Sequence, residues 1–225
     1  MATGSARASA REQVGLFTSL PILWHEAESV RELLNAHPPH WALAVLQGHG
    51  PVRPIDSLLH GRHGAPLRGV TLLVMAQPRA LAPQENVALD RWVRRGGRLL
   101  LLADPMLTGD SRFSPGDPRR PQDVAMLSPI LAHWGLRMLF DEAQPPGEHA
   151  VALEGAEIPV NLPGRLVLAE DARKCAVLAT GIAARCAIGR GHVVVLADAA
   201  LLEDRDTAQA TRINALEHLI ALLGA

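Results

Sequence analysis

Short apolar runs alternate with amphipathic segments over residues 14–140, and this pattern predicts a parallel β-sheet with helices on both faces. The run VTLLVMA (70–76) is apolar on both faces, as a central parallel strand requires. The predicted strands of this type are 14–20, 41–46, 70–76, 98–105 and 192–198, and 136–140 is a further strand. The sequence therefore predicts an α/β fold.

The amphipathic segments between these runs predict the helices. Pro83 suits a first helical turn, apolar positions recur on one side of the segment that follows, and Gly96 and Gly97 end it. Further helices are predicted at 25–36, 123–134 and 207–223, with a short one at 55–59. Residues 106–122 are too rich in Pro, Gly and Asp for regular structure, and a loop of this length is usually functional or disordered.

The rhythm changes near residue 148, where short β-like runs follow one another without helices between them. They predict a β-rich insertion at about 148–188, whose hairpins either extend the sheet or form a small lobe. We expect residues 1–12 to be a flexible leader and residues 13–225 to form one α/β domain that contains this insertion.

Composition narrows the classes of function. The 22 Lys and Arg residues balance 23 Asp and Glu residues, so no strong charge favours nucleic acid, and we expect no nucleic-acid partner. No run approaches the roughly 18 apolar residues of a membrane span, so we expect no direct membrane insertion. Cys175 and Cys186 are too few for a disulfide framework, and we expect two inert buried thiols in a reducing compartment.

Several familiar catalytic motifs are missing. There is no phosphate-binding loop and no Gly-x-Ser-x-Gly element, and Gly189-Arg190-Gly191 precedes a strand instead of a helix. The segment 109–112 (GDSR) shares only three letters with an esterase block. The histidine pairs His37/His40 and His60/His63 lie in loops without nearby acidic or cysteine partners. We therefore expect no metal, no cofactor and no catalytic residue.

The carboxyl ends of parallel strands meet at one edge of a sheet, where doubly wound folds bind their ligands. The predicted edge is polar but offers no nucleophile with its base. Asp104 and Asp198 either cap local turns or contact a ligand, and the arginines of the long loop are either solvated or grip an anionic partner. The candidate binding residues are Thr18, Ser19, Trp24, Gln47, His49, Gln77, Asp104, Arg112, Arg119, Arg120 and Asp198.

Three sequence blocks, taken in order, resemble one known family. The first, Leu67–Pro105, has a strand, a helix ending W-V-x-x-G-G-R and a strand ending D-P; its matching positions are Pro83, Leu89, Asp90, Trp92, Val93, Gly96, Gly97, Arg98, Leu100, Leu102, Asp104 and Pro105. The second, Gly189–Asp204, matches at Gly189, Gly191, Val193–Val195, Asp198 and Leu202, and the helix after it matches at Asn214. Together with segments 14–24 and 127–139, these blocks resemble GldG-like auxiliary domains of ABC-type transport systems.

The resemblance implies a fold similar to flavodoxin and to class I glutamine amidotransferases, without the catalytic cysteine, and a relationship to a domain of intraflagellar-transport proteins. It implies a non-catalytic binding or scaffold module whose partner is a transporter permease or ATPase subunit, or a small ligand such as a sugar or peptide. Family members usually lie outside the cytoplasm behind membrane anchors, which this sequence lacks. We therefore expect a cytoplasmic or membrane-peripheral protein, with a periplasmic location as the alternative. A hydrolase or amidotransferase-like enzyme that uses the strand-end polar residues is the alternative function.

Overall fold

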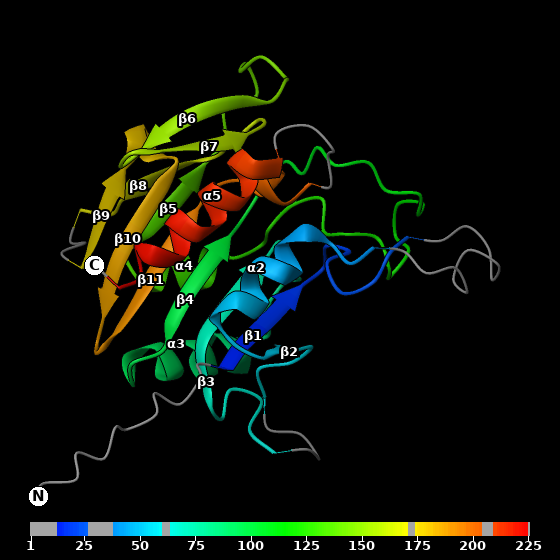
Figure 1. The fold of residues 1–225 in the computed structure, drawn as a ribbon. Helices are drawn as coiled ribbons and strands as arrows, with labels where there is room; N and C mark the ends of the chain where they lie inside the picture. The colour runs from blue at the N-terminus through cyan, green and yellow to red at the C-terminus, as the bar shows by residue number, and fades with distance from the viewer. Residues whose placement is uncertain (1–12, 27–37, 60–63, 171–173, 204–208, 225) are drawn as a thin grey trace, which may run out of the picture.

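A mixed β-sheet forms the centre of the molecule in the computed structural model, which describes residues 13–26, 38–59, 64–170, 174–203 and 209–224 (Figure 1). Within these residues the sheet has seven strands in the order β2-β1-β3-β4-β11-β10-β9. The bounds are β1 (Gln13–Thr18), β2 (Val52–Pro54), β3 (Val70–Ala76), β4 (Arg98–Leu102), β9 (Cys175–Leu178), β10 (Ala183–Ile188) and β11 (Gly191–Leu196).

The first five strands of that order are parallel, and their arrangement is the 2-1-3-4-5 order of flavodoxin-like folds. The predicted fold class is confirmed. Strands β10 and β9 continue the sheet in antiparallel pairing.

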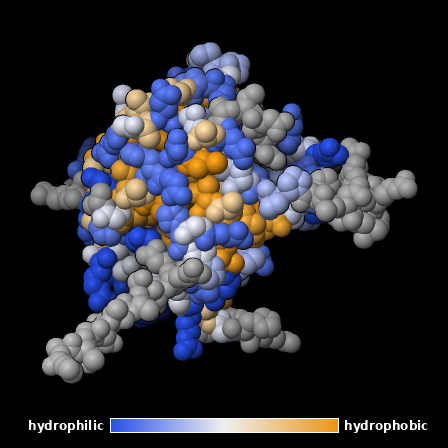
Figure 2. Space-filling model, viewed as in Figure 1, coloured by the Kyte–Doolittle hydropathy of each residue, from blue (hydrophilic) through white to orange (hydrophobic). Residues whose placement is uncertain are grey.

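Both faces of the sheet are apolar, so successive residues of one strand enter different cores. Leu72 and Val74 of β3 face one core, whereas Leu73 and Met75 face the other. The first core is covered by α2 (Trp41–His49) and α5 (Gln209–Ala221), and the second by α3 (Pro83–Arg94) and α4 (Ser128–His133). Figure 2 shows apolar side chains in the middle of the face that carries α2 and α5, with hydrophilic side chains around them.

The β-rich insertion does both things that the sequence left open. Its strands β9 and β10 extend the sheet, while β6 (His149–Leu153) and β7 (Ala156–Val160) form a separate hairpin. Strand β8 (Arg165–Leu168) pairs with β5 (Leu136–Leu139) in another small sheet. Because β7 packs in the first core and β8 in the second, the insertion holds the C-terminal half of the sheet from both faces.

The strand prediction for residues 41–46 is wrong, since these residues form helix α2. Its buried residues Trp41, Ala42, Val45 and Leu46 lie on one helical face, and His40 caps the helix by accepting the Ala42 N–H. A short apolar run fits a strand and a helix equally well in sequence. The second strand of the chain is instead β2, at one edge of the sheet, and residues 55–59 form no helix.

Other boundaries also moved. Helix α4 begins at Ser128, so residues 123–127 of the predicted helix are irregular. The predicted leader 1–12 and most of the predicted helix 25–36 lie outside the described residues.

The Gly-x-Gly element before β11 has a packing role. A Cβ at Gly191 would lie 2.1 Å from the Val93 carbonyl oxygen and 2.4 Å from that of Gly97. Gly189 has φ +64°, and a Cβ there would lie 2.7 Å from the backbone of Arg94. These glycines therefore let the start of β11 approach the end of α3, which accounts for the motif without a nucleotide.

The cysteine prediction is also wrong. Cys175 of edge strand β9 and Cys186 of β10 are directly opposite each other in the antiparallel ladder and form a disulfide. Their Cα atoms are 4.0 Å apart. The pairing depends on strand register, which their separation of 11 residues in the sequence does not reveal.

Candidate functional site

The polar residues at the carboxyl edge of the parallel strands join the strand ends to the long loop 106–122. Gln77, fully buried with φ +43°, follows β3 and accepts the Asp104 N–H at 2.8 Å through Oε1. Its Nε2 donates to the Asp104 and Gln122 carbonyls at 3.2 and 2.7 Å. One amide therefore links the ends of β3 and β4 to the end of the loop.

Thr18 and Ser19 also link neighbouring segments, at the end of β1. The Thr18 hydroxyl donates to the Ala76 carbonyl at 2.8 Å and accepts the Leu20 N–H at 2.9 Å. The Ser19 hydroxyl donates to the Gln77 carbonyl and accepts the Gln122 N–H at 3.0 Å. Both hydroxyls are thus used in holding the edge together.

Asp104 and Asp198 follow β4 and β11 and are fully buried. Asp104 accepts the N–H groups of Met106 (2.8 Å) and Ala199 (3.2 Å). Asp198 accepts those of Asn161 (2.9 Å) and Ala200 (2.6 Å), and so ties the β6–β7 hairpin to the edge. The capping role was one of the two predicted for these residues, and the structure shows it for both.

Burial sets the protonation of this pair. It raises the pKa of Asp104 to about 6, with a smaller contribution from the charge of Glu203. Burial, followed by the charge of Asp104, raises the pKa of Asp198 well above its usual range. Two carboxyl groups that interact in this way titrate as a unit, and one of them keeps its proton at mildly acidic pH.

A cleft of about 770 Å³ opens over the edge between β1 and the segment after β11. Its apolar floor includes Leu20, Leu107 and Leu202. We call it the acidic cleft, because its walls carry three carboxylates. Its polar lining residues are His25, Glu26, His40, Asp110, Ser111, Arg112 and Glu203. Helix η2 (Ala200–Leu202) forms part of this floor.

Hydrogen bonds fix the walls of the acidic cleft. Glu26 accepts the Ser111 hydroxyl at 2.7 Å and the Arg112 N–H at 2.6 Å, which fixes the long loop against the segment after β1. Glu203 accepts the Thr108 hydroxyl at 3.0 Å. The ring of His40 bridges the N-terminus of α2 and the Leu202 carbonyl, 3.0 Å from its Nε2.

The buried Arg212 of α5 supports the same floor from below. It donates to the carbonyls of Ala200 and Leu201 in η2 and pairs with Glu148. Sequence reasoning missed Glu26, Glu203 and Arg212, because no motif marks residues that converge only in the folded chain.

A second hollow, of about 370 Å³, lies on the other side of the long loop, beyond the ends of β1 and β3. We call it the arginine cleft, because Arg79, Arg119 and Arg120 line it together with Thr18, Ser19 and Trp24. Trp24 is 39% exposed, and its ring lies 6.0 Å from that of Phe113. Five of the eleven sequence candidates therefore meet in one cleft.

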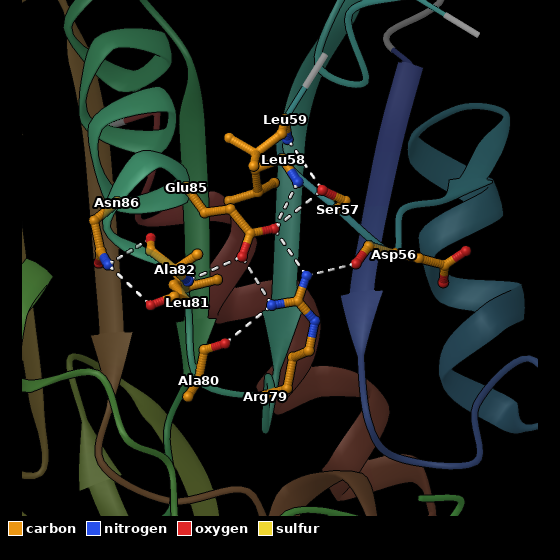
Figure 3. A network of polar contacts seen from close by, with 10 residues as sticks. All are labelled: Asp56, Ser57, Leu58, Leu59, Arg79, Ala80, Leu81, Ala82, Glu85 and Asn86. Carbon is orange, nitrogen blue, oxygen red and sulfur yellow. Dashed lines mark hydrogen bonds and ion pairs between the residues drawn. The ribbon is translucent and has the colours of Figure 1, made fainter. Parts of the chain in front are cut away.

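Arg79 is the best-fixed cation of the arginine cleft. Figure 3 shows it pointing toward Glu85 of α3 and toward the turn at Asp56. Its guanidinium donates twice to Glu85 at 2.8 Å and once to the Asp56 carbonyl. The nearly buried Glu85 also accepts the N–H groups of Ala82 and Leu58. Arg79 and these backbone donors hold the pKa of Glu85 at about 2.

The loop arginines have partners of their own. Arg119 pairs with Asp117 at 2.8 Å, stacks over Phe113 at 4.2 Å and keeps 65% of its side chain exposed. Arg120 pairs with Asp123 at 3.0 Å and donates to the Phe113 carbonyl. Arg112 lies across the loop, in the acidic cleft. The three arginines therefore do not form one patch.

The predicted positions of Gln47 and His49 are wrong, because they depended on the strand prediction for residues 41–46. Helix α2 leads into Pro51, whose carbonyl accepts the N–H of Val14 near the start of β1, so its C-terminal residues lie at the amino edge. His49 there contacts Glu217 of α5 at 2.7 Å. Among the described residues, no three or more His, Cys, Asp and Glu side chains converge as a metal site, and His37, His60 and His63 lie outside them.

A known family matches a segment of the chain that includes Gln77, Asp104 and the long loop. Residues 53–155, somewhat under half of the chain, match the family described as an ABC-type uncharacterized transport system. The predicted family resemblance is confirmed. The match begins in β2 and reaches the turn after β6. A comparison with curated proteins finds no match. No helix of the described residues is long and apolar enough to cross a lipid bilayer.

Solved structures show the same fold at low identity. The N-terminal domain of mmIFT52 is 13% identical with a TM-score of 0.60, over 95% of this chain and 97% of that one. A ThuA-like protein from Bacteroides uniformis is 9% identical with a TM-score of 0.54, over 99% and 95% of the two chains, and supports the amidotransferase-like fold.

The exo-β-1,4-mannosidase Op5Man5 from Opitutaceae bacterium strain TAV5 is 16% identical with a TM-score of 0.56. The likeness covers 95% of this chain but only 36% of the mannosidase, so this chain corresponds to about a third of it. At these identities the likenesses show the fold alone.

Proposed function

We propose that this chain is a non-catalytic binding module of an ABC-type transport system, and that a permease or ATPase subunit docks on the carboxyl edge of its sheet. The observation that carries the proposal is the set of hydrogen bonds that Gln77, Asp104 and Asp198 make. These residues occupy the strand ends where doubly wound enzymes place reactive groups, yet all three bind backbone groups of the same chain.

The surface left open at this edge suits a protein partner. It consists of the acidic cleft and the arginine cleft, on either side of the long loop. Trp24 and Arg119 are both exposed, and both contact the ring of Phe113. Trp and Arg are among the residue types that most often anchor protein interfaces. The cystine Cys175–Cys186 favours an oxidising compartment, and so the periplasmic alternative for location.

Co-purification tests this docking surface. The full chain is co-expressed with the tagged permease and ATPase subunits of an ABC transporter from the same genome. We expect R119E and W24A to reduce the retained chain about tenfold, with a stronger dependence on salt for the wild type than for R119E. The matched control is R68E, an exposed arginine before β3 at the opposite edge. Equal retention of all variants, or an equal loss in R68E, would contradict the proposal.

One observation favours the enzyme alternative. The Ser111 hydroxyl and the Glu26 carboxylate are 2.7 Å apart in the acidic cleft, an arrangement in which a carboxylate can accept a proton from a nucleophile. Turnover of p-nitrophenyl acetate by the purified chain, abolished by both S111A and E26Q, would support a hydrolase. Absence of turnover would support the non-catalytic module, and turnover that survives both substitutions would show that Ser111 and Glu26 are not a catalytic pair.

A further inference from the structure

A third hollow, of about 630 Å³, lies between the two small β-sheets. It lies beyond the carboxyl end of β11, because the neighbouring Gly164 donates its N–H to the Ala197 carbonyl at 2.7 Å. Its lining comes from the segment after β5, from β6, from the start of β8 and from helix η1 (Ala179–Gly181). We call it the lobe notch; none of the candidate residues from the sequence lies in it.

Arg165 is the cation of the lobe notch. It begins β8 opposite Leu139, and its side chain is exposed. Its aliphatic part lies against η1, since a Cβ at Gly181 would be 2.6 Å from Arg165 Cγ. Within the described residues, no carboxylate forms an ion pair with its guanidinium, in contrast to Arg79, Arg119 and Arg120 at the arginine cleft.

Backbone strain gathers around the same hollow. Ala179 and Thr180 of η1 have φ values of 43° and 57°, and Leu162, just before the lining residue Pro163, has 52°. These are three of the five non-glycine residues with positive φ in the described chain. Residues of this kind cluster at ligand sites, where the surrounding structure holds them in place.

The side chains define the class of ligand. Phe140, Val151 and Ile182 supply an apolar wall, and Arg165 offers the planar pair of donors that binds a carboxylate. Asp141 also lines the notch and repels a doubly charged anion such as phosphate more than a singly charged one. We propose that the lobe notch binds a small monocarboxylate with an apolar body, whose carboxylate pairs with Arg165. This site is separate from the docking surface and does not depend on it.

Amide chemical shifts of the ¹⁵N-labelled full chain test the site, with 3-phenylpropionate as the probe. Saturable shifts are expected at Gly164, Thr180 and Gly181, with a dissociation constant on the order of 1 mM. R165Q should weaken binding at least about tenfold, and R165K should weaken it less, since a lysine keeps the charge without the paired donors. Neutral 3-phenylpropanol and inorganic phosphate should both bind more weakly than the carboxylate.

The matched control is R137Q, which removes an exposed arginine on the adjacent strand β5 outside the notch and should leave binding unchanged. Unaltered spectra away from the notch show that each variant is folded. The proposal is overturned if about 20 mM of the probe causes no saturable shift at these amides, if R165Q binds as well as the wild type, or if phosphate binds as tightly as the carboxylate.

Discussion

The carboxylate of Asp104 accepts the backbone N–H of Ala199, the residue that follows Asp198, so two buried carboxyl groups meet at the ends of β4 and β11. Their pKa values are both raised, that of Asp104 to about 6. At neutral pH the folded chain must therefore hold negative charge where burial disfavours it. The pair joins the long loop and the β6–β7 hairpin to the sheet at the expense of stability at higher pH.

The first prediction concerns the pH dependence of this pair. An unfolded Asp loses its proton near pH 4, whereas the folded pair keeps a proton to about pH 6 or above, so the folded state binds more protons in between. The free energy of unfolding should fall by at least about 1.4 kcal/mol from pH ~5 to pH ~7.5, because about one pH unit of the Asp104 shift lies in that window. D198N should flatten this slope in thermal or urea unfolding, whereas E157Q, at an exposed position on β7, should keep it. An unchanged slope in D198N would show that the pair is not its source.

The second prediction concerns the buried carboxylate of α3. E85A should lower the free energy of unfolding by about 2–3 kcal/mol, because it leaves Arg79 and the N–H groups of Leu58 and Ala82 without their acceptor. Since its pKa is lowered to about 2, this contribution is present above pH ~4.5 and is lost as the pH falls toward 2.

Urea unfolding at neutral pH measures this effect. D117N removes the ion pair between Asp117 and the exposed Arg119 and is the matched control, and it should leave the free energy of unfolding nearly unchanged. Similar losses in both variants would mean that burial of Glu85 adds nothing to its ion pair.

The third prediction concerns the Gly-x-Gly element. G191A should lower the free energy of unfolding by more than about 3 kcal/mol, since its Cβ would overlap two backbone carbonyls that cannot move aside. G48A is the control: Gly48 lies in helix α2 with open space around it, and alanine there should be neutral or stabilise by up to about 1 kcal/mol. Thermal melts of the two variants should therefore shift in different directions or by very different amounts.

The fourth prediction concerns the disulfide. C175S, or reduction of the wild type, should lower the free energy of unfolding by about 2–3 kcal/mol, because the bond between β9 and β10 restricts the unfolded chain. Titration of thiols in the native, unreduced protein should find none. Two reactive thiols in that titration would show instead that Cys175 and Cys186 are free in solution.

The sequence determined four of the five parallel strands, β1, β3, β4 and β11, but not the strand β2 at one edge of the sheet. The predicted strand 70–76 and the helix from Pro83 match β3 and α3, because β3 is apolar on both faces, α3 has one apolar side and Gly96 and Gly97 end it; β4 ends three residues before the predicted end. These signals are local and need no knowledge of distant contacts. The meeting of Thr18, Gln77, Asp104 and Asp198 at one edge also followed, since parallel strands end together.

Only the tertiary structure decided what those residues do. The Asp198 carboxylate accepts the backbone N–H of Asn161, and the Ser19 hydroxyl accepts the backbone N–H of Gln122. No spacing rule connects residues so far apart in the sequence. Residues 41–46 became a helix because Trp41 and Leu46 pack in the first core, and the two cysteines met because strand register placed them opposite each other. Local periodicity sets which segments form strands and helices, whereas hydrogen-bond partners, clefts and cross-links depend on how those segments pack.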